Sequence, residues 1–311
     1  MILSVTLNPS VDISYEIPSF KLDESNRTNE VRKTAGGKGL NVTRVSHLLG
    51  AEVQATGILG GTIGQFIENQ LNQHSIKHNF YKIDQESRNC IAILHDGNQT
   101  EVLEPGPTLT TEIAEGFETH FSRLLELGTN VVTISGSLPK GISTDYYAGL
   151  IARANRFGIP VVLDTSGQAL HAVLSNSARP TIIKPNLSEL KQLLAESVTT
   201  DVDVLKKALA NPLFHDIETI VVTLGKDGAF VKHQGDYYTV SIPVVKAVNP
   251  VGSGDATVAG MAKALSEKHS IESIVKSGMA AGVLNAMEKQ TGYVQASNFD
   301  QYYSMITMTK H

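Results

Sequence analysis

The sequence predicts an α/β protein in which helices cover both faces of a mostly parallel central sheet, with a second, small β-sheet beside it. From residue 110 onward, helical and strand-like segments alternate, as is typical of βαβ units. These segments lie at 111–127, 130–135, 143–157 and 159–164. Before residue 104, short runs of alternating apolar and polar residues dominate, and Asp96-Gly97 joins two of them as a β-hairpin turn.

The composition is that of a globular protein. Of the 311 residues, 41% are hydrophobic and 18% charged, and the net charge of −5 gives no electrostatic support for binding nucleic acid. The first residues lack a basic segment, and no apolar run is long enough to span a bilayer, so we expect neither a signal peptide nor a membrane anchor. Cys90 is the single cysteine, which excludes an internal disulfide and favours the cytoplasm. Because it lies in an apolar strand, we interpret it as a packed core thiol.

The first third of the chain supplies the small sheet and the start of the large one. Strands or extended segments are expected at 1–7, 11–17, 27–34, 52–59, 77–83, 88–94 and 100–103. Helices are expected from about residue 38 to 49 and at 65–74, with a turn at 60–64 between strand and helix. We assign the small sheet to parts of 11–34 and 88–104 and the α/β core to the remainder of a single domain, 1–311.

The remaining third continues the large sheet. Strands are expected at 181–184 and 219–224, followed by a hairpin. An extended run at 242–248 leads to a helix after Asp255, and further helices are expected at 271–287 and 298–308.

One stretch carries the clearest chemistry, the segment from Asn249 to Gly260. Gly252 and Gly254 leave the backbone uncrowded at a helix start, where N–H groups and the positive end of the helix dipole attract a phosphate. A carboxylate such as Asp255 cannot bind that phosphate, but it can remove a proton from a hydroxyl that attacks the phosphorus. The alternative is a plain loop in which Asp255 only caps the helix.

A second glycine-rich stretch, 35–43, opens an earlier helix. Its three glycines allow a ligand to approach the backbone, Lys38 adds a positive charge and Asn41 an amide. The glycine spacing does not fit a dinucleotide fingerprint, so we reject a Rossmann nucleotide site. A simple helix-capping turn is the alternative.

Two further motifs follow predicted strands. Ser137 lies in a loop after the strand at 130–135, at a carboxyl end where ligands gather in open α/β sheets. Asn186 and Glu189 start a helix directly after Lys184, and their spacing fits either helix capping or a magnesium site.

Together, the stretches 249–260 and 35–43 resemble the two signatures of the ribokinase-like (PfkB) family of carbohydrate kinases. The motifs between them occur in family order, so the resemblance covers essentially the whole chain. It implies a three-layer αβα core with a mostly parallel sheet and a small β-sheet lid that closes over the sugar. It also implies ATP and Mg²⁺ as cofactors, a phosphorylated ketohexose as substrate and a homodimer formed through the lid. Some relatives also bind a monovalent cation near the anion hole.

The resemblance assigns roles to individual residues. Asp255 becomes the catalytic base, and the backbone of the Gly252–Asp255 stretch forms the anion hole, in which the amides of Gly252, Ser253 and Gly254 stabilise the transferred phosphoryl group. The substrate residues are Asp12, Gly37, Lys38, Asn41 and Ser137, with Arg88 and Arg27 as candidates for the substrate phosphate. The nucleotide residues are Lys184, Asn186, Glu189, Thr223, Gly225, Gly228 and Asn285, with Asn186 and Glu189 holding Mg²⁺ through water.

Two questions stay open at this level. The motifs are shared by members that act on different ketohexose phosphates, so they do not identify the sugar. A sugar-phosphate sensor without catalysis, built on the same fold, is a different class of function. The intact Gly252–Asp255 stretch argues against it, because a sensor does not need a base.

Overall fold

The computed structural model describes all 311 residues and contains two separate sheets. The larger sheet has eleven strands, in the order β15-β14-β13-β12-β11-β10-β9-β1-β4-β5, with β6 also paired to β4. Their bounds are β1 Ile2–Thr6, β4 Val53–Gly60, β5 Lys77–His78, β6 Tyr81–Ile83, β9 Val131–Ser135, β10 Val161–Asp164, β11 Ile182–Ile183, β12 Thr219–Thr223, β13 Ala229–His233, β14 Asp236–Ser241 and β15 Thr307–Lys310.

All pairs from β5 and β6 through β12 are parallel, and only β13, β14 and β15 are added antiparallel at one edge. This arrangement confirms the predicted mostly parallel sheet. Because the parallel strands run in one direction, their carboxyl ends meet at one edge of the sheet, which is where ligands bind in such folds.

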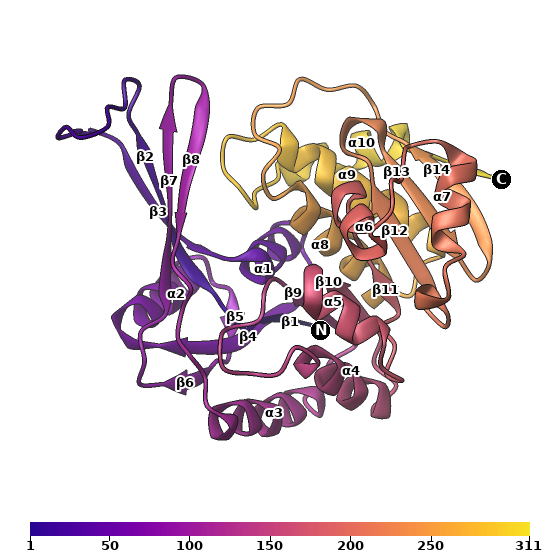
Figure 1. The fold of residues 1–311 in the computed structure, drawn as a ribbon, viewed down its shortest axis with the longest axis horizontal. Coiled ribbons are helices and arrows are strands. Elements are labelled where there is room, and N and C mark those ends of the chain that lie inside the picture. Colours follow the sequence, from indigo (N-terminus) through magenta and orange to yellow (C-terminus); the bar gives the residue numbers. More distant parts are fainter.

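Helices cover both faces of the large sheet (Figure 1). Their bounds are α1 Lys38–Leu48, α2 Gly61–Gln73, α3 Thr111–Leu125, α4 Tyr146–Arg156, α5 Gly167–Leu174, α6 Leu187–Leu194, α7 Val202–Leu209, α8 Ser253–Ser266, α9 Ile271–Ala286 and α10 Phe299–Met305. Neighbouring strand residues alternate between two cores: Val132 packs with α3 to α7, whereas Val131 packs with α1, α8 and α9. The result is a three-layer αβα core.

The small sheet has the order β3-β2-β7-β8 and stands apart from the core (Figure 1). Its strands are β3 Val31–Gly36, β2 Ser10–Glu16, β7 Arg88–His95 and β8 Asn98–Leu103. The base of β2 is anchored, because Val11 and Ile13 bury their side chains against Ile67 and Leu71 of α2. The outer half of the sheet has no such support.

Several element predictions were wrong in detail. The expected turn at 60–64 is already the start of α2, and the expected helix at 298–308 stops at Met305, after which the chain pairs with β14 as β15. The run at 242–248 is an irregular, largely exposed loop rather than an extended strand, because no neighbouring strand offers it hydrogen bonds.

Two helices, α5 and α7, were not predicted at all. Each has only eight residues, so each shows barely two turns of apolar periodicity.

In the extended segment 27–34, pairing begins only at Val31, and 77–83 divides into the two short strands β5 and β6. None of the helices combines the length and apolar character needed to cross a membrane.

Candidate active site

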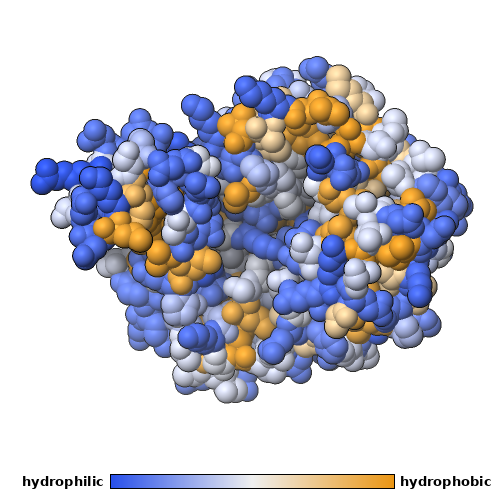
Figure 2. Space-filling model, turned by 45° about the horizontal axis from the view of Figure 1, so that its top comes forward, coloured by the Kyte–Doolittle hydropathy of each residue, from blue (hydrophilic) through white to orange (hydrophobic).

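A cavity of about 1930 Å³ opens between the small sheet and the carboxyl ends of the parallel strands. Figure 2 shows the hollow between the two parts of the molecule. Pockets for one small ligand usually measure on the order of 300–1,000 Å³, so this cavity can hold two ligands together. Residues of both glycine-rich stretches line it, including Gly37, Lys38, Asn41 and Asp255.

Asp255 lies in the first turn of α8, with only 5% of its surface exposed. The helix begins after Gly252, whose φ of +85° places it in the left-handed region that favours glycine. A Cβ atom at Gly252 would also lie 2.8 Å from Cγ2 of Thr291. Gly252 is therefore required both for the turn and for the close packing that brings Asp255 into the cavity.

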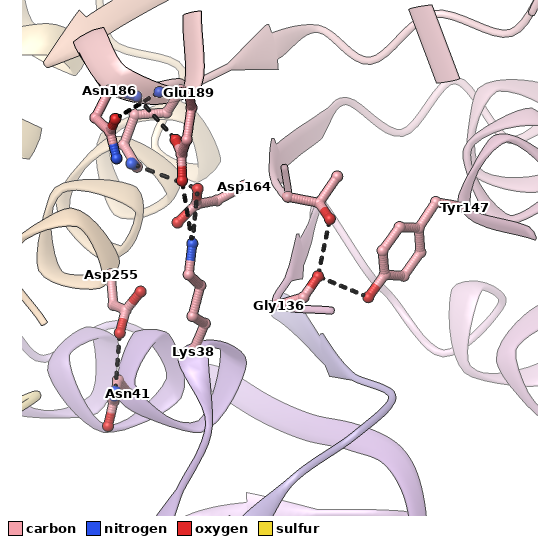
Figure 3. A network of polar contacts seen from close by, with 10 residues as sticks. Lys38, Asn41, Gly136, Tyr147, Asp164, Asn186, Glu189 and Asp255 are labelled. Carbon is pink, nitrogen blue, oxygen red and sulfur yellow. Dashed lines mark hydrogen bonds and ion pairs between the residues drawn. The ribbon is translucent and has the colours of Figure 1, made fainter. Parts of the chain in front are cut away.

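Asn41 Nδ2 donates a hydrogen bond of 2.8 Å to Oδ2 of Asp255 (Figure 3). Burial, with a smaller effect from the negative charge of Asp164, raises the pKa of Asp255 to about 7. The hydrogen bond from Asn41 and the charges of Lys38 and Lys184 limit this rise in pKa. A carboxylate with a pKa near neutrality is well matched to act as a general base.

Backbone N–H groups at the start of α8 provide an anion site beside this carboxylate. Those of Gly252, Gly254 and Asp255 donate no hydrogen bond within the protein, whereas that of Ser253 donates to the carbonyl of Pro250 at 3.2 Å. The free donors therefore include the N–H group of Asp255, the last residue of the stretch Gly252–Asp255 that was expected to form the anion hole. The Ser253 N–H group, which was expected to belong to the anion hole, is already engaged.

Asp164, at the carboxyl end of β10, is a site residue that sequence reasoning missed. It is 1% exposed, and its Oδ1 lies 3.4 Å from Nζ of Lys184 and 3.5 Å from Nζ of Lys38 (Figure 3). Neither contact has hydrogen-bond geometry, so both carboxylate oxygens keep free lone pairs. The sequence did indicate this position, because the predicted strand at 159–164 ends in Asp164 at the edge of the sheet where ligands bind.

Lys38 lies in the cavity, but its ammonium group extends toward Asp164 and Glu189. The distance to Oε1 of Glu189 is 3.8 Å, and the charge of Asp164 raises the pKa of Lys38. The side chain therefore stays protonated. This position puts Lys38 with the residues expected to hold the nucleotide phosphates, although the sequence assigned it to the sugar.

Asn186 and Glu189 form a capping box at the start of α6. Oδ1 of Asn186 accepts from the Glu189 N–H group at 2.8 Å, and Oε2 of Glu189 accepts from the Asn186 N–H group at 2.9 Å. The capping alternative is confirmed, and it uses one of the two lone pairs of Asn186 Oδ1. The oxygens without a hydrogen bond are Oε1 of Glu189 and those of Asp164, an oxygen set that suits Mg²⁺ with several bound waters.

The opposite side of the cavity is formed by the small sheet. Asp12 Oδ1 accepts a hydrogen bond of 2.7 Å from Ser10 Oγ, and burial raises the pKa of Asp12. Arg88 donates from Nε to the carbonyl of Asn8 at 3.2 Å and from Nη1 to that of Glu104 at 3.0 Å. These bonds hold the guanidinium group at the cavity wall with Nη2 unpaired.

The predicted nucleotide residues Lys184, Thr223, Gly225 and Gly228 also line the cavity. Gly228 has a φ of +86°, and a Cβ atom there would lie 2.0 Å from the carbonyl of Val240, so no side chain fits. The loop 242–251 completes this wall with apolar side chains that the sequence had not assigned to the site.

Three predicted residues lie elsewhere. Arg27 and Ser137 are exposed and do not line the cavity. Asn285 is fully buried and also outside it: Nδ2 donates to the carbonyl of Val251 at 2.9 Å, and Oδ1 accepts from the Gly292 N–H group at 2.9 Å. Asn285 therefore braces the loop before α8 instead of facing a nucleotide in this conformation.

Comparison with known proteins agrees with this geometry. Residues 5–297 match the family model described as pfkB family carbohydrate kinase. Two tagatose-6-phosphate kinases from strains of Staphylococcus epidermidis are each 52% identical over 306 residues, which cover 98% of this chain and 98% of theirs.

Solved structures agree as well. Phosphofructokinase-2 from Escherichia coli, determined in complex with potassium, superimposes with a TM-score of 0.89 at 28% identity, covering 97% of this chain and 98% of its own. A Staphylococcus aureus protein provisionally described as a phosphofructokinase gives a TM-score of 0.84 at 32% identity, with coverage of 100% and 99%.

Proposed function

Because this chain belongs to the PfkB family of carbohydrate kinases, we propose that it phosphorylates D-tagatose 6-phosphate at the C1 hydroxyl. The products are D-tagatose 1,6-bisphosphate and ADP, and the reaction belongs to lactose and galactose breakdown. The 52% identity to tagatose-6-phosphate kinases over nearly the whole chain supports the choice of sugar. The observation that carries the reaction type is a buried Asp255 directly beside free N–H groups at a helix start.

In this mechanism Asp255 accepts the proton of the sugar C1 hydroxyl as the oxygen attacks the γ-phosphorus of ATP. Its pKa of about 7 leaves a large fraction ionised near neutral pH. The N–H groups of Gly254 and Asp255 donate to the phosphoryl oxygens as their charge shifts in the transition state. Their positions are set before the substrate arrives, because α8 is built into the core.

Lys38 and Lys184 bring two positive charges to the same place. Lys184 Nζ would lie 3.1 Å from a Cβ atom built on Gly254, so its ammonium group borders the anion hole. Both lysines can move from Asp164 to the phosphates when ATP binds. Asp164 and Glu189 would then hold Mg²⁺, which neutralises phosphate charge in reactions of this kind.

The small sheet supplies the sugar side. Asp12 accepts hydrogen bonds from sugar hydroxyls, and the free end of the Arg88 guanidinium pairs with the 6-phosphate, as its forked geometry allows. The sheet closes as a lid over the sugar and excludes water, which otherwise accepts the phosphoryl group.

The small sheet also forms the contact between two copies of the chain. Its two edge strands, β3 and β8, expose Val31 and Val102, which are 50% and 54% accessible. Apolar side chains on open sheet edges favour pairing with another chain. Light scattering should report a dimer, and the variant carrying Val31→Glu and Val102→Glu should be monomeric. A monomeric unmodified protein would contradict this contact.

The proposed site also includes a monovalent cation bound near the start of α8. The relative from Escherichia coli, which was solved in complex with potassium, supports this. The measurement compares activity in potassium chloride with activity in N-methylglucamine chloride at equal ionic strength. Equal rates in the two salts would remove the cation from the proposal.

The experiment that tests the substrate measures ADP release with ATP and Mg²⁺, comparing kcat/KM for tagatose 6-phosphate, fructose 6-phosphate and fructose 1-phosphate. We expect tagatose 6-phosphate to give the highest value. A preference for fructose 1-phosphate would retain Asp255 as the base but make the protein a 1-phosphofructokinase. Tight binding of a sugar phosphate without ADP release would instead favour a sensor.

A further inference from the structure

Arg44 makes an unusual set of contacts beneath the active site. It lies three residues after Asn41 on α1, and its Nη1 donates to Oδ1 of Asn41 at 3.1 Å and to the carbonyl of Thr291 at 3.3 Å. Its Nη2 donates to the carbonyl of Ala35, at the end of β3. One guanidinium group thus joins the lid strand, the helix that carries Asn41 and the segment after α9.

These contacts determine which end of the Asn41 amide faces Asp255. The two ends of a carboxamide have nearly the same shape, but one donates hydrogen bonds and the other accepts them. Arg44 can only donate, so it holds the oxygen end. The nitrogen end is then turned toward Asp255, which it reaches at 2.8 Å. With the amide reversed, its oxygen would face a carboxylate and repel it.

The surrounding packing leaves little freedom for another arrangement. A Cβ atom at Gly292 would lie 2.6 Å from Oδ1 of Asn41 and 2.8 Å from Nη1 of Arg44. The backbone at Gly292 therefore closes directly over the contact between the two side chains. Asn41 itself is 6% exposed, so water does not readily replace the guanidinium group.

We infer that Arg44 is a positioning residue for phosphoryl transfer, acting through the amide of Asn41 to keep Asp255 able to accept a proton. This inference rests on the proposed function, because it concerns the base of that reaction. Nothing places Arg44 in contact with the reacting groups, and it is absent from the lining of the cavity.

The charges around Asp255 show in which direction the loss of Arg44 shifts the pKa of Asp255. Asp164 on β10 disfavours ionisation of Asp255, while Asn41 and Lys38 on α1 and Lys184 after β11 favour it. Arg44 also interacts favourably with the charges of Asp255 and Asp12. Removing Arg44 raises the pKa of Asp255 mainly by freeing the Asn41 amide to turn, because the Asn41 hydrogen bond affects this pKa more than the charge of Arg44 does.

The test measures kcat/KM against pH for Arg44→Met, Asn41→Ala and the double variant, using the sugar phosphate that the unmodified enzyme prefers. We expect the acid limb of Arg44→Met to move up by about one pH unit, with an about fivefold loss of kcat/KM at pH 7 that shrinks at higher pH. If Arg44 acts through Asn41, adding Arg44→Met to Asn41→Ala should change kcat/KM by less than about twofold. Independent, multiplicative losses would contradict the inference.

Arg153→Met is the matched control. Arg153 pairs with Glu118 between α3 and α4, outside the cavity, so the same substitution breaks an ion pair without touching Asn41. Its acid limb should stay in place. If Arg44→Met lowers kcat/KM equally at every pH, as a purely structural defect would, the inference is wrong.

Two further measurements keep the inference testable. If Arg44→Met does not fold, Arg44→Lys replaces it, and we expect a smaller shift of the limb in the same direction because one ammonium group cannot reproduce the contacts of both Nη1 and Nη2. Carboxyl ¹³C NMR of the unliganded protein, assigned with Asp255→Asn, should show a raised pKa of Asp255 in either variant. That titration does not depend on turnover, so it separates failure of this inference from failure of the proposed function.

Discussion

Asn41 and Asp255 are 214 positions apart in the chain, yet Nδ2 of the first donates a 2.8 Å hydrogen bond to the second. The contact joins the two glycine-rich stretches, because Asn41 lies on α1 and Asp255 in the first turn of α8. It orients the carboxylate and stabilises its ionised form in a buried place. The predictions below follow from this carboxylate and the groups around it.

Asp255→Asn should fold and bind ATP but lose turnover. Removing a well-placed general base typically lowers kcat by on the order of 10² to 10⁴. Single-turnover ADP formation measures the loss, and calorimetry with ATP checks that binding remains. Asp300→Asn is the control, because Asp300 is exposed on α10, away from the cavity. Near-normal turnover in Asp255→Asn would remove Asp255 from the mechanism.

The pH profile of kcat/KM should have an acid limb near pH 7. Burial raises the pKa of Asp255 to about 7, and a base must be ionised to act, so activity rises with pH through this value. Each pH unit below the limb should lower kcat/KM about tenfold. Full activity down to pH 5 would show that the base titrates near the ordinary value for aspartate.

The same buried carboxylate should lower stability at high pH. Because the folded pKa is raised, the folded state keeps a proton that the unfolded state releases between about pH 4 and 7. Stability therefore falls as pH rises through this window, by about 4 kcal/mol at most. Asp255→Asn removes this cost, so its Tm should exceed that of the unmodified protein more at pH 8 than at pH 5. An equal difference at both pH values would argue against a buried ionised Asp255.

Lys38 and Arg88 should affect different steps. Lys38 lies beside Asp164 and Glu189, so Lys38→Met should lower kcat by roughly 10² to 10³ through lost charge stabilisation. Arg88 lies on β7 of the small sheet, and Arg88→Met should mainly raise the KM for the sugar phosphate, by about ten- to a hundredfold. Steady-state kinetics in both substrates separates the effects. If Lys38→Met raised only the KM for the sugar phosphate, Lys38 would act on the sugar.

Gly36→Ala should disturb Asp12. A Cβ atom at Gly36 would lie 2.1 Å from the carboxylate of Asp12, so that side chain has to move. The KM for the sugar phosphate should increase while the KM for ATP changes little. Gly149→Ala in α4 is the matched control, because a Cβ atom there has its nearest neighbour at 3.8 Å. An unchanged sugar KM in Gly36→Ala would mean that Asp12 does not contact the sugar.

Elements with strong local patterns were predictable from the sequence. The strand at 159–164 and the helix after Asp255 have long apolar runs or glycine signals, and the structure contains both. The helices α5 and α7 were missed because eight residues give too little periodicity. The loop 242–248 looks β-like in sequence, but it has no partner strand.

Some residues of the candidate site were likewise predictable from the sequence, and others were not. Asp255, Gly252 and Asn41 could be singled out because each lies in a contiguous motif, and the structure brings them together. Arg27 and Ser137 also lie in plausible positions along the chain, yet they remain outside the cavity. Asp164 has no motif around it and becomes a site residue only because β10 ends between Lys38 and Lys184.

The amino-acid order thus determined the α/β class, the glycine-rich helix start and the identity of the candidate base, since periodicity and turn chemistry act between residues close in the chain. Only the tertiary structure decided that Asp255 is buried with a pKa of about 7, that Lys38 turns to Asp164, and that Arg44 holds Asn41. Burial and charge interactions depend on which distant elements pack together, and no local pattern specifies those distances.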